Sequence, residues 1–136
     1  MNPCLRIALL AATFAFGLSA PSWAQKRYGP GVSDSEIVIG QTMPYSGPAS
    51  AYGTIGRVEA AYFKMLNEHG GVNGRKIRLD SLDDGYSPPK AVELTRRLVE
   101  QEGVLLMFQP LGTPSNTAIQ KYMNDRAVPQ LFVATG

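Results

Sequence analysis

Hydroxyl and backbone groups near residue 113 are of a kind that could hold an anion. Gly112, Thr113 and Ser115 surround the expected start of a helix, and Pro114 occupies its first turn, where no backbone donor is needed. A helix start carries partial positive charge and free N–H groups. These residues could therefore bind the carboxylate of a small molecule, or Thr113 could simply cap its own helix.

A second loop, residues 43–52, offers one aromatic side chain for the same purpose. Tyr52 stands where it could cover a ligand lodged in this loop, although a single tyrosine is more often part of a core. Both loops are rich in small residues and lead into a helix. They predict binding of a small molecule through backbone donors.

Sequence signatures of catalysis and of cofactor binding are not found. The stretch 47–53 has neither G-x-G-x-x-G spacing nor a following Lys-Ser/Thr, which argues against a nucleotide or phosphate cofactor. His69, the only histidine, has no cysteine or second histidine beside it, so neither a metal site nor a His-activated nucleophile is supported. Asp83 and Asp84 are expected to cap a loop and turn. We predict no enzyme activity, no metal and no cofactor.

Alternating strands and helices must position these loops. The expected strands are 36–42, 76–82, 104–108 and 128–134, and the expected helices run through 58–66, from 87 to 99 and from 113 to 123. This order predicts an α/β fold with a parallel sheet and helices on both faces. Ligands bind such sheets outside the carboxyl ends of the strands, which selects the loops 43–52, 83–88 and 109–113.

Hydrophobic patterns predict how these elements are buried. Strand 36–42 is nearly continuously apolar and should be buried on both faces, whereas 76–82 alternates and suits an edge. Strand 104–108 is sized for a central position. The buried face of the first helix is predicted from helical spacing as Val58, Ala61, Tyr62, Met65 and Leu66.

Composition and the N-terminus predict an exported protein. The 136 residues carry 13 Lys+Arg and 11 Asp+Glu, too few clustered cations for a nucleic-acid partner. Residues 1–24 contain an apolar run too short to span a membrane and end in Ser22-Trp23-Ala24, which predicts a signal peptide cleaved after Ala24 and a periplasmic product. The alternative is a buried N-terminal helix. Residues 25–34 are predicted to be a flexible lead-in.

Several stretches together resemble a known family. They are 37–40 running into 43–48, Tyr52-Gly53, 70–75, Asp83-Asp84, 112–116 and 128–132. In order and spacing they resemble the N-terminal part of type I periplasmic solute-binding proteins of ABC transporters, the branched-chain amino acid (Leu/Ile/Val) class. The resemblance implies two α/β lobes that close on a ligand, with residues 35–136 forming the early part of the first lobe in a truncated chain.

The resemblance also implies roles for individual residues. Tyr52 corresponds to an aromatic that lines the cleft, and Thr113 to the hydroxyl and backbone donor for the ligand carboxylate, with Ser115 nearby. Ala134 and Gly136 correspond to positions whose backbone meets the polar end of the ligand. The family's amino-acid binders place a hydroxyl at the position of Gly136, and Thr135 can substitute only after a one-residue shift.

The implied function is capture of a solute for transport. The protein would bind a small carboxylate-bearing solute, an amino acid or a related amide or aromatic acid, and deliver it to the membrane permease of an ABC importer. Two alternatives stay open at this point. One is an exported α/β enzyme whose catalytic residues lie outside this sequence, and the other is an extracellular sensory ligand-binding domain.

Overall fold

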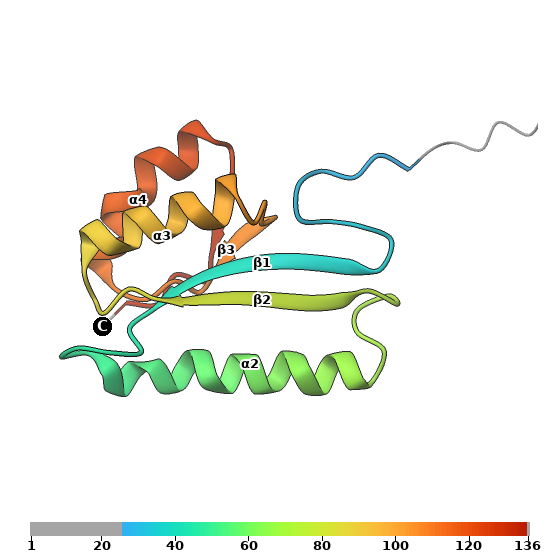
Figure 1. Ribbon diagram of the computed structural model, residues 1–136, viewed down its shortest axis with the longest axis horizontal. Helices are drawn as coiled ribbons and strands as arrows, with labels where there is room; N and C mark the ends of the chain where they lie inside the picture. The colour runs from blue at the N-terminus through green and yellow to red at the C-terminus, as the bar shows by residue number, and fades with distance from the viewer. Residues whose placement is uncertain (1–25, 136) are drawn as a thin grey trace, which may run out of the picture.

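Four parallel strands form the centre of the computed structural model, which describes residues 26–135 (Figure 1). The strands are β1 (Glu36–Met43), β2 (Lys76–Asp83), β3 (Leu106–Phe108) and β4 (Gln130–Leu131), and their order in the sheet is β2-β1-β3-β4. Every pair of neighbours is parallel, which confirms the predicted sheet. The predicted signal peptide and Gly136 lie outside the described residues.

Helices cover both faces of this sheet, as predicted. A short 3-10 helix, η1 (Ser50–Tyr52), leads into α2 (Gly53–Glu68), and the other helices are α3 (Pro88–Glu100) and α4 (Thr113–Asp125). Figure 1 shows α2 along one face of β1 and β2, with α3 and α4 together on the opposite face. Within residues 26–135, no helix has the length and apolar character needed to cross a membrane.

Strand β1 has neighbours on both sides and is the most buried strand. It pairs with β2 over its full length, from Glu36 opposite Lys76 to Met43 opposite Asp83, and with β3 on its other side. Strand β2 occupies one edge of the sheet, as its alternating pattern predicts. Strand β4 is shorter than the predicted 128–134, because Phe132 turns to a φ of +55° directly after the two paired residues.

The main core lies between the sheet and the pair α3 and α4. It consists of fully or almost fully buried apolar side chains from β1, α3, the segment before β3, β3 itself and α4: Val38, Leu98, Val104, Met107, Ile119 and Met123. The approach is close at Gly40, where a Cβ would lie 3.0 Å from Met107 Sδ and 3.3 Å from Leu98 Cδ1. Helix α3 supplies Leu98 to this core, and α4 supplies Ile119 and Met123.

The predicted buried face of α2 is wrong. Val58, Tyr62 and Met65 are 62%, 54% and 49% exposed, Ala61 is also exposed, and only Leu66 of the predicted set is partly buried. The helix instead turns Gly53, Gly56, Glu59, Phe63 and Asn67 toward the sheet. The glycines let the helix lie close to the sheet, and the polar residues of this face, Glu59 and Asn67, are hydrogen-bonded. A search for apolar residues at helical spacing therefore does not detect this face.

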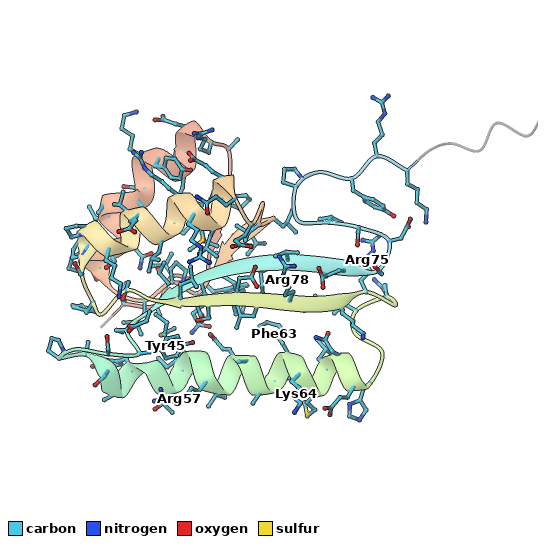
Figure 2. The ribbon with its side chains drawn as sticks, viewed as in Figure 1. Tyr45, Arg57, Phe63, Lys64, Arg75 and Arg78 are labelled. Atoms are coloured by element: carbon cyan, nitrogen blue, oxygen red, sulfur yellow. The ribbon has the colours of Figure 1, made fainter. Side chains whose placement is uncertain are left out.

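Polar side chains hold α2 against the sheet. The Asn67 side chain donates to Ile77 O (2.7 Å) and accepts from Ile77 N (2.8 Å). Figure 2 shows Phe63 and Tyr45 between α2 and the strands. The Phe63 ring meets Phe108 of β3 edge-on, with their centroids 5.5 Å apart.

The lead-in segment contacts the amino end of the sheet. Gly31 O accepts a hydrogen bond from Val38 N (2.7 Å), and Asp34 accepts from Lys26 (3.0 Å) and Tyr28 (2.6 Å). A Cβ at Gly31 would lie 2.2 Å from Leu105 N, so the chain can pass here only with glycine.

Candidate functional site

Three loops meet at the carboxyl edge of the sheet, and a carboxylate joins the first two. Asp83 Oδ1 accepts hydrogen bonds from the backbone N–H groups of Tyr45 (2.9 Å), Ser46 (3.1 Å) and Gly85 (3.0 Å). Hydrogen bonds from Ser46, Gly85 and Tyr45 lower the pKa of Asp83, because they favour its charged form. The prediction that Asp83 organises a loop is confirmed.

An aromatic contact joins the second and third loops. The ring of Tyr86 lies over Gly112, where a Cβ would come within 2.8 Å of Tyr86 Cε2. Both residues have left-handed backbones, with φ of +62° at Tyr86 and +110° at Gly112. Gly112 is therefore required both for its conformation and for the space under the ring. Nothing in the one-dimensional pattern indicates this contact.

Helix α4 begins at Thr113, as expected, but its N-cap residue is not the one that the sequence suggested. Gly112, not Thr113, is the N-cap residue, and no side chain makes a capping hydrogen bond. Asn116 instead holds the loop before α4 through hydrogen bonds. Its backbone N–H donates to Gly112 O (2.9 Å), and its side chain donates to Pro110 O (3.0 Å) and Gly112 O (2.9 Å). The alternative that Thr113 is there to cap its own helix is therefore wrong.

The first turn of α4 presents donors at the carboxyl edge. The N–H groups of Thr113 and Ser115 belong to this turn and have no acceptor within the helix, and Pro114 has no N–H. The Thr113 residue is exposed, whereas Ser115 is only 2% exposed and lies on the helix face that includes Ile119 and Met123. The Ser115 hydroxyl is thus not on the surface beside Thr113.

The other predicted ligand-binding residues also lie at this edge. Tyr52 ends η1 in the first loop and is 51% exposed. Ala134 is tied to the third loop, since its N–H donates to Pro110 O (3.1 Å) and its C=O accepts from Gly112 N (2.9 Å). Thr135 is exposed, and Gly136 lies outside the described residues.

A groove of about 440 Å³ runs between α4 and β4. Thr113 and Thr135 line one end of it, and Asn124 and Val128 line the other. The groove therefore follows the open edge of β4, and only one end of it reaches the loops described above.

Sequence reasoning missed a polar network under α2. Gln41, which is fully buried, donates to Glu59 Oε2 and accepts from Ser81 Oγ (2.7 Å), and Ser81 Oγ is 2.6 Å from Tyr45 OH. Because Ser81 donates to Gln41, Tyr45 must donate to Ser81. Burial raises the pKa of Glu59. Among residues 26–135, no group of three His, Cys, Asp or Glu side chains is placed to hold a metal ion.

Comparison with known proteins places the fold and its loops in a family. A family model described as periplasmic binding protein matches residues 36–136. The chain belongs to the periplasmic binding protein family. Among the described residues, the parallel sheet with helices on both faces corresponds to a lobe of the type I members.

Relatives of this periplasmic binding protein include named solute-binding proteins. It is 33% identical over 99 residues to an amino acid binding protein of Pseudomonas aeruginosa, covering 71% of this chain and 23% of the relative. It is 33% identical over 89 residues to Leu/Ile/Val-binding protein homolog 1 of Brucella abortus, covering 65% of this chain and 20% of the relative. The chain thus spans about a fifth of the length of these relatives.

Two solved structures show the same fold with different named solutes. A fatty acid ABC transporter substrate-binding protein from Thermomonospora curvata matches with a TM-score of 0.66 and 30% identity, over 76% of this chain and 27% of that one. The branched-chain amino acid transporter substrate binding protein LivJ from Streptococcus pneumoniae, in complex with isoleucine, matches with a TM-score of 0.64 and 27% identity, over 71% of this chain and 28% of that one.

Proposed function

We propose that this chain is part of the extracytoplasmic solute-binding component of an ABC importer. It captures a small carboxylate-bearing solute, a branched-chain or other amino acid, and the whole protein delivers it to the permease. The proposed location is the periplasm, after cleavage behind Ala24. The named relatives support this proposal, since they include amino-acid binders and a fatty-acid binder, whose solutes share a carboxylate.

One observation carries the proposal at the level of atoms. The first turn of α4 opens at the carboxyl edge of the sheet, with Thr113 exposed and its hydroxyl not used as a cap. The N–H groups of Thr113 and Ser115 and the Thr113 hydroxyl can then bind the carboxylate. The partial positive charge of the helix start favours this anion.

The roles of the remaining site residues are proposed from the family resemblance. Tyr52 covers the apolar part of the solute from the first loop. By the same resemblance, Ala134, Thr135 and Gly136 are proposed to contact the polar end of the solute. The Ala134 N–H already has an acceptor, and the Ala134 carbonyl, which accepts from Gly112 N, has a second lone pair for the solute. Closure of a second lobe would bury the solute, which is the hinge motion of periplasmic binders.

The first experiment identifies the solute class. A thermal-shift screen of the mature protein against amino acids, amides and aromatic acids should show stabilisation by a carboxylate-bearing compound, because a ligand that binds only the folded state raises its stability. Stabilisation by uncharged amides alone would refute the carboxylate proposal.

The second experiment tests Thr113 with the solute so identified. Thr113→Val removes the hydroxyl with little change in volume, and calorimetry should show affinity weakened by about tenfold or more, as expected for a hydrogen bond to a charged group. The matched control is Thr117→Val, an exposed hydroxyl one turn further along that donates to Thr113 O (2.9 Å). Equal affinity of wild type and Thr113→Val would exclude the hydroxyl as a ligand group.

A further inference from the structure

Three polar side-chain atoms are buried without a hydrogen-bond partner among the described residues on the face of the sheet that α3 covers. They are Thr42 Oγ1, Thr95 Oγ1 and Asp84 Oδ2, and each belongs to a residue with no exposed surface. Buried hydroxyl and carboxyl oxygens are almost always hydrogen-bonded in folded proteins, to protein or to ordered water. Three such atoms therefore require a physical explanation.

Strand alternation places Thr42 under α3. Gln41 points to the opposite face, where it bonds Glu59 of α2, and Gly40 faces Leu98 of α3. Since side chains alternate along a strand, Thr42 shares the face of Gly40. It lies one step closer to the carboxyl edge than Gly40.

Helix geometry brings Thr95 to the same place. Ala91, Thr95 and Leu98 are the buried residues of α3 and have the spacing of one helix face. Leu98 contacts Gly40, and α3 runs opposite to β1, so the turn containing Thr95 lies over the stretch between Gly40 and Thr42.

Asp84 closes this space at the carboxyl edge. Its N–H donates to Met43 O (3.2 Å), next to Thr42, and its Oδ1 accepts from Tyr86 N (2.9 Å), which leaves Oδ2. Leu82, in β2, packs against the core under α3, and continuing the alternation past Asp83 puts Asp84 on that face. Burial raises the pKa of this carboxyl.

We propose that an internal water site lies at this point, bridging Thr42, Thr95 and Asp84 beneath the first turns of α3. Water is the ligand that these groups fit, because it both donates and accepts and can satisfy two hydroxyls and a carboxyl oxygen together. The site also supports the third loop, since Thr42 O accepts from Leu111 N (3.1 Å) just before Gly112.

A crystal structure of the mature protein, at a resolution that shows ordered solvent, tests the site directly. The expected result is a water peak within hydrogen-bond distance of all three oxygens. A dry site, or direct hydrogen bonds among the three side chains, would overturn the proposal. So would a monovalent cation, which anomalous scattering after a thallium(I) acetate soak would reveal.

Thermal unfolding of Thr95→Val gives a second test, because the melting temperature should change in opposite directions with and without the water. Valine keeps the volume and removes the hydroxyl. If the hydroxyl binds a bridging water, the melting temperature falls because the water loses a partner. If the hydroxyl has no partner at all, its removal raises the melting temperature and refutes the proposal. Thr54→Val, at an exposed position of α2, is the matched control and should change the melting temperature little.

Discussion

Replacing Gly56 by alanine tests how closely α2 approaches the sheet. Gly56 is buried in the first half of α2, and a Cβ there would lie 2.2 Å from the Tyr45 hydroxyl oxygen and 3.1 Å from Gln41 Oε1. At an ordinary helix position this substitution stabilises a protein by about 1 kcal/mol. At Gly56 we expect the substitution to destabilise the protein instead.

The magnitude follows from the contacts that the methyl group would displace. Tyr45 must move, which breaks its 2.6 Å hydrogen bond to Ser81. That loss is about 1 kcal/mol, and overpacking adds about 1–3 kcal/mol. After the helix-propensity gain of about 1 kcal/mol, Gly56→Ala should destabilise the protein by about 1–3 kcal/mol.

Urea unfolding of the protein measures the effect, and a second substitution isolates its cause. In a Tyr45→Phe background the hydroxyl is gone, so adding Gly56→Ala should change the free energy of unfolding by less than about 1 kcal/mol. Ala61→Gly, at an exposed position of the same helix, reports the helix propensity alone. If Gly56→Ala stabilises the wild type, or costs as much in the Tyr45→Phe background, the close contact is not the cause.

Two further predictions concern single side chains. Asp83 has a lowered pKa in the folded state, so its contribution to stability is present above the unfolded-state pKa of about 3.8 and is lost as pH falls through the folded-state value. The free energy of unfolding in urea, measured between about pH 2 and 6, should therefore fall less at low pH in Asp83→Asn than in the wild type. An equal fall in both proteins would contradict this prediction. Asn67→Ala removes two hydrogen bonds to Ile77 and should lower the free energy of unfolding by about 1–3 kcal/mol. Hydrogen exchange of the Ile77 amide should also become faster, and an unchanged exchange rate would show that the contact is dispensable.

Most of the sheet could be predicted from the sequence because its signals are local. The continuous apolar character of 36–42 and the alternation of 76–82 reflect burial on two faces and an edge position, and β1 and β2 confirm both. The inner face of α3, with Ala91, Thr95 and Leu98, also follows from its spacing.

The face of α2 could not be predicted in this way, because its packing depends on groups that hydrophobic periodicity does not count. Gly56 contributes by the absence of a side chain, and Glu59 is partly buried because Gln41, eighteen residues earlier, supplies a donor. The pattern therefore selected Val58, Tyr62 and Met65, which are exposed.

The candidate site was predictable in its location but not in its detail. Chain order alone brings the three loops to one edge, since parallel strands share their carboxyl ends. The contact of Tyr86 with Gly112, and the cap at Gly112 in place of Thr113, depend on how separate loops meet in three dimensions. The role of Thr113 itself stays a prediction.

The Asn67 side chain has a consequence for how copies of this protein behave toward one another. Ile77 lies in β2, an edge strand of the sheet formed by residues 26–135, where a free N–H and C=O would pair with a strand of a second molecule. The carboxamide occupies both groups and so imitates the backbone of a further strand. Asn67 thereby blocks intermolecular strand pairing at the amino half of β2.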